Sequence, residues 1–250
     1  MSSLESEDTV VRLSGATYSV NGKKLVGPLD FSVLHGETVV LLGESGSGKT
    51  TTLRLINALI YPTEGTVFVE GRDSREWDPV ELRRRTGYVI QETGLLPHFT
   101  VGQNVGLVPK LKAWDTSRTS ARIDEMLELV DLPVDEYRDR YPHELSGGQR
   151  QRVGVARALA ADPPLLLCDE PFGAVDPATR RALQREFASL TRRLQKTVVF
   201  VTHDVREARL LGDRILVIDR GLVSFDGSIQ EFADSDDNAV RELRGEPWSS

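Results

Sequence analysis

Three short segments of this chain combine residue types that can bind a phosphate chain and cleave it. The first is Gly43–Thr50, which reads Gly-Glu-Ser-Gly-Ser-Gly-Lys-Thr and follows a continuous apolar run. Its glycines let the backbone approach phosphate oxygens, and the helix expected after it directs its N-terminus at them. Lys49 is spaced to reach the β- and γ-phosphates, and the Thr50 hydroxyl to bind Mg²⁺. The predicted nucleotide-binding residues are Gly43, Glu44, Ser45, Gly46, Ser47, Gly48, Lys49, Thr50 and Thr51.

The second segment, Leu165–Glu170, is an apolar run that ends in two carboxylates. Ligands of α/β proteins bind at the carboxyl edge of the sheet, so Asp169 and Glu170 are expected there. Either carboxylate can bind Mg²⁺ or orient a water molecule, and the spacing does not assign the roles. The alternative for Glu170 is an acidic residue in a loop or at a helix start, with no catalytic role. Its place after a buried strand and before Pro171 disfavours that alternative.

The third segment, Leu145–Gln149, reads Leu-Ser-Gly-Gly-Gln and is called the signature segment below. It precedes a predicted helix, so Ser146 can cap that helix while the bare amides of Gly147 and Gly148 face an anion. The alternative is a helix cap with no ligand. The order of the three segments, rather than any one of them, is the informative feature of the sequence.

The elements that must position these segments follow from hydrophobic periodicity. Residues 10–18 and 29–33 alternate as half-buried antiparallel strands do, and Asn21-Gly22 is a hairpin signal between them. The continuous apolar run Thr38–Leu42 predicts a strand covered on both faces, followed by a helix from Lys49 to about Ile60. Further strands are predicted at 66–69, 87–90, 165–169 and 198–202, with a final hairpin at 214–225.

Between about residues 95 and 161 the periodicity becomes helical, because Ile123, Met126, Leu127 and Val130 fall on one face. The same spacing recurs at Val153, Ala156 and Ala160, and Pro177 fits a first helical position. We therefore expect an α/β nucleotide-binding core with an antiparallel β subdomain and an inserted helical lobe. The expected parts are 1–95 (core), 96–161 (helical lobe), 162–232 (core) and 233–250 (a short polar tail, loosely ordered).

Composition limits the function classes. The 250 residues carry 31 Lys and Arg against 38 Asp and Glu, a formal charge of −7, which disfavours a general nucleic-acid binder. No apolar run approaches the roughly 18 residues that span a bilayer, and the acidic N-terminus does not resemble a secretory signal. The single cysteine, Cys168, rules out an internal disulfide, suits a reducing cytoplasm and is expected to be a small core residue.

With these motifs in this order, the chain resembles the ATP-binding subunit of an ABC transporter, from about Val10 to about Phe232. The resemblance implies a P-loop ABC-type ATPase that uses ATP and Mg²⁺. It assigns Asp169 to Mg²⁺, through a bridging water molecule, and Glu170 to polarising the attacking water. It assigns His203 to the γ-phosphate and Gln91 to sensing Mg²⁺ and the γ-phosphate where the lobes join. It assigns Tyr18 to stacking on adenine, for which the alternative is an ordinary strand aromatic.

The resemblance also implies a dimer. In this family each ATP lies between the phosphate loop of one subunit and the signature segment of the other, here Ser146, Gly147, Gly148 and Gln149. The expected partner is a second copy or a homologous ATPase, with Asp176 in the loop that crosses the interface. If the signature segment were only a helix cap, ATP would not drive this association.

Separate membrane permease subunits, which work with a solute-binding protein, are expected to place the chain at the cytoplasmic face of the membrane. The apolar stretch after Gln91, within 92–101, suits contact with them. Segments 94–111 and 137–146 look most like importers of glycine betaine, choline and related osmoprotectants. The best-known betaine members carry C-terminal regulatory modules, and we do not expect one in the short tail.

Other readings are an importer ATPase for an amino acid or another solute, a non-transport ATPase of the superfamily, and a scaffold with a dead site. The non-transport ATPases usually carry a long coiled coil or two cassettes, and neither is visible here. A dead site would be expected to lose Lys49, Glu170 or His203, and all are present.

Overall fold

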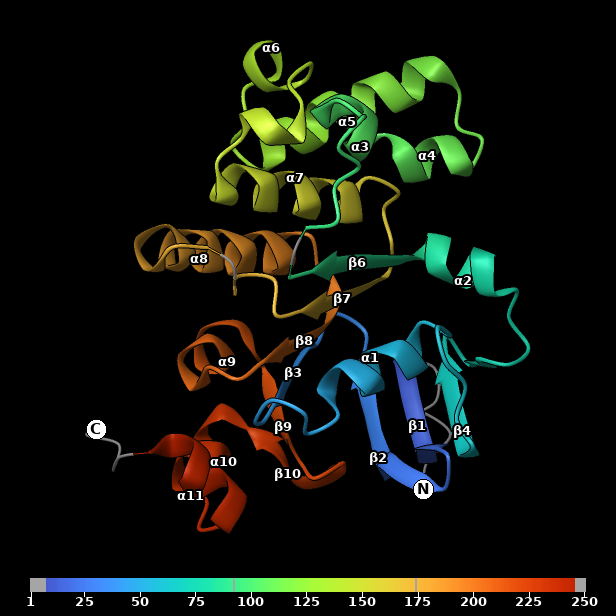
Figure 1. The fold of residues 1–250 in the computed structure, drawn as a ribbon, viewed down its shortest axis with the longest axis vertical. Coiled ribbons are helices and arrows are strands. Elements are labelled where there is room, and N and C mark those ends of the chain that lie inside the picture. Colours follow the sequence, from blue (N-terminus) through green and yellow to red (C-terminus); the bar gives the residue numbers. More distant parts are fainter. Residues whose placement is uncertain (1–7, 92, 174, 246–250) are drawn as a thin grey trace. The chain divides into compact units, whose positions relative to one another are not determined.

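The computed structural model describes residues 8–91, 93–173 and 175–245. In these ranges the chain forms both helices and strands, as expected for an α/β protein (Figure 1). Contacts divide the chain into unit 1, Met1–Leu82 with Thr191–Ser250, and unit 2, Arg83–Leu190. Unit 2 contains the predicted helical segment together with two strands and most of one long helix. No helix of the described residues combines the length and the apolar character needed to cross a membrane.

The strands are β1 (Thr9–Val20), β2 (Lys23–Leu34), β3 (Thr38–Leu42), β4 (Glu64–Val69), β5 (Arg72–Asp73), β6 (Thr86–Ile90), β7 (Leu165–Asp169), β8 (Thr197–Thr202), β9 (Arg214–Asp219) and β10 (Leu222–Ser228). The helices are α1 (Lys49–Ile56), α2 (Pro79–Arg85), α3 (Val101–Val105), α4 (Leu107–Leu111), α5 (Thr116–Leu129), α6 (Val134–Tyr137), the 3-10 helix η1 (Pro142–Glu144), α7 (Gly147–Leu159), α8 (Pro177–Arg193), α9 (Val205–Leu211), α10 (Ile229–Asp234) and α11 (Asn238–Arg244).

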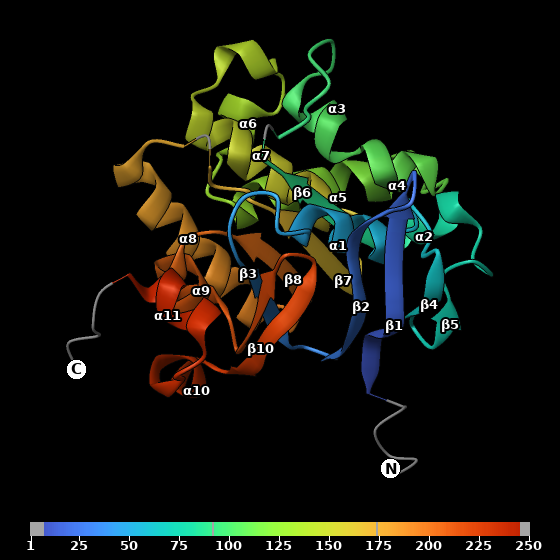
Figure 2. The ribbon, with the colours of Figure 1, turned by 60° about the horizontal axis from the view of Figure 1, so that its bottom comes forward.

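Unit 1 contains the predicted antiparallel subdomain, a sheet in the order β2-β1-β4-β5. β1 and β2 form the long ribbons that run side by side in Figure 2. The turn between them is the predicted one: Asn21 and Gly22 both have positive φ, 52° and 75°. Two such residues match the twist of an antiparallel pair, so this two-residue connection sets the hairpin register.

The second set of strands in unit 1 has the order β10-β9-β3-β8. β3 pairs in parallel with both β8 and β9, and every residue of β3 and β8 is buried. Burial on both faces explains why these strands are continuous apolar runs rather than alternating ones. Because β3, β8 and β9 are parallel, the segments that follow them meet at one sheet edge. This edge therefore receives the phosphate loop.

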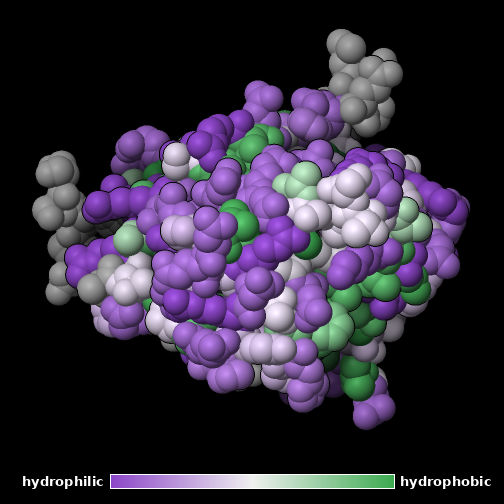
Figure 3. All heavy atoms as spheres, turned by 90° about the horizontal axis from the view of Figure 1, so that it is seen from above, coloured by the Kyte–Doolittle hydropathy of each residue, from purple (hydrophilic) through white to green (hydrophobic). Residues whose placement is uncertain are grey.

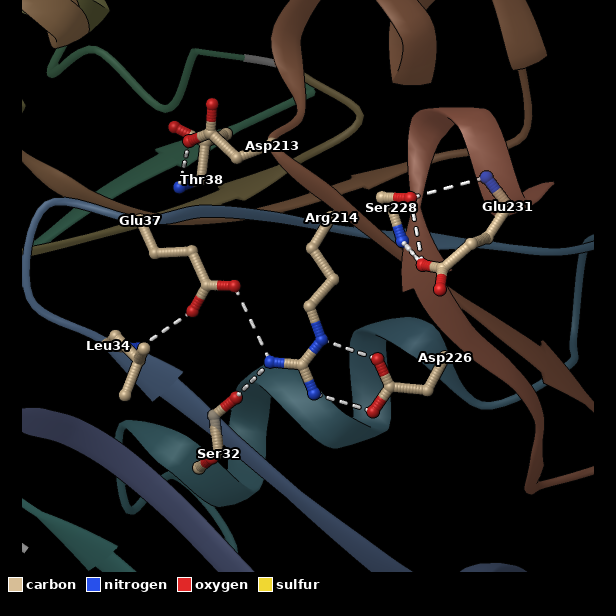
Figure 4. A network of polar contacts seen from close by, with 9 residues as sticks. All are labelled: Ser32, Leu34, Glu37, Thr38, Asp213, Arg214, Asp226, Ser228 and Glu231. Atoms are coloured by element: carbon tan, nitrogen blue, oxygen red, sulfur yellow. Dashed lines mark hydrogen bonds and ion pairs between the residues drawn. The ribbon is translucent and has the colours of Figure 1, made fainter. Parts of the chain in front are cut away.

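Arg214 fixes the opposite end of β9 (Figure 4). Its guanidinium pairs with both carboxylate oxygens of Asp226 on β10, and it donates to the Ser32 carbonyl at 3.0 Å and to Glu37 at 3.4 Å. The hydrogen bonds to Asp226 raise the pKa of the Arg214 guanidinium, because the carboxylate stabilises the charged form. The network ties β9 to β10 and to β2, and through Glu37 to the segment between β2 and β3.

We predict that Arg214→Met lowers the free energy of unfolding by about 1–3 kcal/mol, because two carboxylates and a carbonyl lose a charged donor. Urea unfolding measures this loss. The control is Arg220→Met, since the Arg220 side chain is 92% exposed; its effect should stay within about 0.5 kcal/mol. Equal losses in the two variants would show that the network does not stabilise the unit.

Unit 2 contains the helical segment and the parallel pair β6 and β7. The predicted apolar face of α5 is confirmed, because its members lie at 5% exposure or less: Ile123, Met126, Leu127 and Val130. On α7 and just after it, Val153, Ala156 and Ala160 are also fully buried. Pro177 begins α8, as predicted.

Two boundary predictions are wrong. α1 ends at Ile56 rather than near Ile60, because Asn57 closes the helix and Ala58 has a left-handed φ of 51°. The expected loosely ordered tail after Phe232 is largely helical up to residue 245. Asp237 caps α11 by accepting from the amides of Ala239 and Val240, and the Val240 side chain is completely buried. Residues 246–250 lie outside the described residues.

Candidate functional site

The phosphate loop follows β3 in unit 1, and two of its glycines have no room for a side chain. Gly43 has φ 155°, and a Cβ there would lie 2.3 Å from the Ile218 carbonyl oxygen. Gly48 has φ 111°, and its Cβ would lie 2.3 Å from Cγ1 of Val26. The loop is therefore wedged between β9 and β2, and only glycine fits at either point.

The loop offers what a nucleotide polyphosphate needs. α1 begins at Lys49 with no side-chain cap and no acidic residue in its first turn, so its N-terminal amides suit an anion. The Lys49 ammonium donates to the carbonyl oxygens of Gly43 at 2.8 Å and Glu44 at 2.6 Å, which holds it over the loop. Ser47 Oγ is buried and has no hydrogen-bond partner in the part of the chain that the structure describes. A bound phosphate would provide an acceptor for that hydroxyl.

The sheet register places His203 beside this loop. β3 and β8 end in register, with Leu42 opposite Thr202, so His203 and Gly43 follow at the same edge. The His203 side chain is exposed there, so it is accessible to a ligand. Tyr18 is half-buried on β1 opposite Val26, the residue that packs on Gly48. Unit 1 therefore brings Tyr18, the phosphate loop and His203 to one region, with Thr50 and Thr51 in the first turn of α1.

A hollow of about 190 Å³ flanks the phosphate loop in the same unit. One wall is formed by Gly43–Ser47, and the other by the end of β9 and the residues Ala239, Glu242 and Leu243 of α11. The Gly221 amide, in the turn after β9, also donates to the Ser47 carbonyl at 2.9 Å. The turn and α11 were not expected near the loop, and the polar composition of residues 233–245 gave no signal for it.

In unit 2 the two carboxylates and Gln91 meet at one sheet edge. β6 and β7 run parallel with Ile90 opposite Asp169, so Gln91 and Glu170 are the next residues on each strand. A Cβ on Gly173 would lie 2.9 Å from the Gln91 side-chain nitrogen, so the Gln91 amide rests against the turn after Glu170. The Tyr88 hydroxyl lies 3.5 Å from Oδ2 of Asp169, a long hydrogen bond that the sequence did not predict.

Cys168, just before these carboxylates, is a core residue as expected. It is completely buried, and burial raises the pKa of its thiol well above the usual value. The thiol is therefore protonated and unreactive at neutral pH.

The signature segment forms a capping box at the start of α7. Ser146 Oγ accepts from the Gln149 amide at 3.2 Å, and the Ser146 amide donates to the Gln149 side chain at 2.8 Å. The side-chain nitrogen of Gln149, Nε2, donates to the Tyr137 hydroxyl at 2.8 Å. Ser146 is exposed, and its hydroxyl proton can still be donated after the oxygen has accepted a hydrogen bond. Gln149 is thus engaged in shaping the turn, and Ser146 faces solvent.

Gly148 brings the signature segment against the start of α8. A Cβ on Gly148 would lie 2.7 Å from Cγ2 of Thr179. The Thr179 amide in turn donates to the Asp176 carboxylate at 3.1 Å, and Arg180 donates to the Val175 carbonyl at 2.9 Å. Asp176, expected in an interface loop, is therefore held at a helix start next to the signature. Ala174, in the same loop, lies outside the described residues.

The candidate residues thus form two groups, each ordered within its own unit. Unit 1 holds Tyr18, Gly43–Thr51 and His203, and unit 2 holds Gln91, Ser146–Gln149, Asp169, Glu170 and Asp176. One contact that sequence reasoning missed is Arg157 of α7, which donates to the carbonyls of Thr93 and Gly94. Backbone acceptors carry no residue-type signal, so the sequence could not have identified it.

The chain is similar to known proteins of one family. A family model described as ABC transporter matches residues 26–173. The glycine betaine/carnitine/choline transport ATP-binding protein OpuCA of Bacillus subtilis (strain 168) is 56% identical over 200 residues, 80% of this chain and 52% of that protein. The glycine betaine uptake system ATP-binding protein YehX of Escherichia coli (strain K12) is 47% identical over 219 residues, 88% of this chain and 71% of that protein.

A solved structure has the same fold. The ATP-binding cassette MJ0796, as a dimer in a post-hydrolysis state bound to ADP and Pi, matches with a TM-score of 0.77 and 34% identity over 88% of this chain and 98% of that one. The chain spans about half the length of curated relatives such as OpuCA. The family match covers more than half of the sequence and includes the phosphate loop, the signature segment and both carboxylates. The chain belongs to the ABC transporter family, and its fold is that of the family's P-loop ATPase core.

Proposed function

We propose that this chain is the ATP-hydrolysing subunit of an importer, and that it works as a head-to-tail pair around two ATP molecules. The observation that carries the proposal is the coexistence of two anion-binding helix starts: the open N-terminus of α1 and the capped turn at Ser146. One nucleotide held between the loop of one copy and the turn of another uses both. The dimeric cassette MJ0796 supports this arrangement by analogy.

Within each site we assign roles by position. Lys49 and the amides at the start of α1 hold the phosphates, and Tyr18 stacks on the base. Glu170 orients the attacking water and His203 contacts the γ-phosphate. When bound, Mg²⁺ would neutralise charge on the phosphates, and its proposed protein ligands are Thr50, Gln91 and Asp169. Removal of Mg²⁺ with EDTA should stop hydrolysis, which a phosphate-release assay measures.

The proposed partners are membrane permease subunits at the cytoplasmic face of the membrane. The segment Leu95–Phe99 supports the contact, because Leu96 is 38% exposed and Phe99 is 36% exposed. Figure 3 looks onto one face of the molecule, where hydrophobic patches are scattered in a mostly hydrophilic surface. Scattered apolar side chains are normal on a protein surface, so the support rests on two large ones exposed within one short segment, Leu96 and Phe99.

We predict that Leu96→Asp abolishes transport while the isolated chain still binds ATP. A charge buried at an interface without a partner costs several kcal/mol, roughly 3–5. Solute uptake, with copurification of the permease subunits, measures the first effect, and nucleotide binding by the isolated chain measures the second. Leu111→Asp is the matched control, since Leu111 is 50% exposed in the same unit but outside the segment. Normal transport by Leu96→Asp would place the contact elsewhere.

The proposed cargo is a quaternary ammonium osmoprotectant such as glycine betaine or choline. Support comes from the relatives, since OpuCA and YehX are both described as transport or uptake components for such solutes. The test is ATP hydrolysis by the assembled transporter with its solute-binding protein. Stimulation of hydrolysis by glycine betaine or choline supports the proposal. Stimulation by an amino acid, with no response to glycine betaine or choline, contradicts it.

A further inference from the structure

Arg157, near the end of α7, grips the backbone that follows Gln91. Its two terminal nitrogens donate to the Gly94 carbonyl at 2.7 Å and to the Thr93 carbonyl at 2.6 Å. The side chain is half-buried, and this burial lowers the pKa of the guanidinium. A guanidinium whose planar fork donates to two carbonyls makes a specific attachment that a lysine cannot reproduce.

The turn that Arg157 holds has an unusual backbone. Thr93 and Gly94 both have left-handed φ values, 53° and 54°. The left-handed conformation is unfavourable for Thr93, which has a Cβ, so the surrounding contacts must stabilise it. Thr93 also lies over Gly154, one turn before Arg157, where a Cβ on the glycine would be 3.7 Å from that of Thr93. The turn is therefore seated on one face of α7.

The two ends of this seated turn lead to functional segments. Gln91 lies two residues before Thr93, with its amide against Gly173. On the other side, the buried Asn104 side chain accepts from the Leu96 amide at 2.8 Å and donates to the Phe99 carbonyl at 3.1 Å. Asn104 of α3 thus holds the backbone of the proposed docking segment, Leu95–Phe99. Arg157 of α7 holds the turn at Thr93 and Gly94 in the same way.

We propose that Arg157 is a positioning residue that links Gln91 to the signature helix α7, so that Gln91 and Ser146 move together. Ser146 caps one end of α7 and Arg157 lies near the other end. A rigid helix transmits a displacement of the turn to the signature. The inference rests on the proposed function, in which Gln91 meets Mg²⁺ and the γ-phosphate. It adds a residue that acts through Gln91 rather than on the nucleotide.

The test compares Arg157→Met with Arg122→Met in the full chain. Arg122 is the matched control, because it also donates to two backbone carbonyls, those of Leu159 and Ala160, at the end of α7. We expect Arg157→Met to lower kcat by about 10- to 100-fold, since misplacing a positioning group by about 1 Å has effects of this size. KM for ATP should change by less than about threefold, because the phosphate loop is intact. Arg122→Met should keep kcat within about threefold of the unsubstituted chain.

A second arm tests whether the effect passes through Gln91. In a Gln91→Ala background, Arg157→Met should lower kcat by less than about threefold, because residues that act through one another are not additive. Hydrogen exchange should also become faster at residues 93–99 in Arg157→Met but not in Arg122→Met. If Arg157→Met does not fold, Arg157→Lys is used, for which a smaller loss of kcat and faster exchange are expected.

Two results would overturn the inference while leaving the proposed function intact. One is an equal loss of kcat in Arg157→Met and Arg122→Met, which would reduce Arg157 to a stabilising residue. The other is a full additional loss in the Gln91→Ala background. Absence of ATP hydrolysis by the unsubstituted chain would instead contradict the proposed function, and the inference with it.

Discussion

Lys49→Ala is expected to abolish ATP hydrolysis and to weaken ATP binding by at least roughly 10-fold. Each hydrogen bond between a charged donor and phosphate contributes about 1.5–3 kcal/mol, which corresponds to about 10- to 100-fold in affinity. Lys49 is 4% exposed and already held over the loop by the Gly43 and Glu44 carbonyls. Its ammonium therefore needs little reorganisation to meet the phosphates.

Thermal unfolding with and without ATP measures this effect directly. A ligand stabilises the folded state in proportion to the logarithm of its concentration over Kd, so Lys49→Ala should lose most of the shift that ATP produces. Thr52→Val is the control, because the buried Thr52 hydroxyl donates to the Gly48 carbonyl of the same helix. That variant should retain both the shift and the activity. Unchanged hydrolysis by Lys49→Ala would refute the assignment of the phosphate site.

Much of this site could be predicted because its determinants are local in sequence. The phosphate loop depends on glycines at fixed spacing, and Gly43 and Gly48 occupy positions where a Cβ would collide. The strands before it and before His203 are continuous apolar runs because they are buried on both faces. The Asn21-Gly22 turn was likewise set by two residues that tolerate positive φ.

The rest depended on contacts between distant segments. α11 is helical although its sequence is mostly polar, because Asp237 caps it and Val240 alone is completely buried. A seven-residue helix with one anchoring side chain has no periodicity to detect. The end of α1 was missed for the opposite reason, since Leu59 and Ile60 continue an apolar run although Ala58 has left the helix. Burial of Val240 therefore decided the first case, and the left-handed backbone of Ala58 decided the second.

The roles of the candidate residues stay predictions, because position at a sheet edge does not distinguish a metal ligand from a base. Gln91 and Glu170 are next to each other by register, and the carboxylate of Asp169 lies near the Tyr88 hydroxyl. Hydrolysis rates of substituted chains are needed to distinguish their functions. Among Gln91, Asp169 and Glu170, we expect the largest effect on hydrolysis at Glu170.

Glu170→Gln should lower the rate of hydrolysis by about 10²–10⁴, because the amide keeps the shape of the carboxylate but accepts a proton poorly. ATP binding should survive, since the phosphate contacts belong to other residues. Glu186→Gln is the matched control: Glu186 lies in the same unit and pairs with Arg152 at 2.6 Å, away from the sheet edge. It should hydrolyse ATP normally. Full hydrolysis by Glu170→Gln would remove the role proposed for that carboxylate.

The same variant tests the dimer. If ATP bridges the phosphate loop of one copy and Ser146 of another, slow hydrolysis keeps the two copies together. In size-exclusion chromatography Glu170→Gln should therefore elute as a dimer with ATP and as a monomer with ADP. Adding Ser146→Arg should abolish the dimer, because a bulky side chain fills the turn that receives phosphate. Loss of the cap alone costs about 1 kcal/mol, so Thr100→Arg, which removes the equivalent capping box of α3, is the control. Dimerisation that survives Ser146→Arg but fails in Thr100→Arg would place the interface on another surface, and Ser146 would then be only a helix cap.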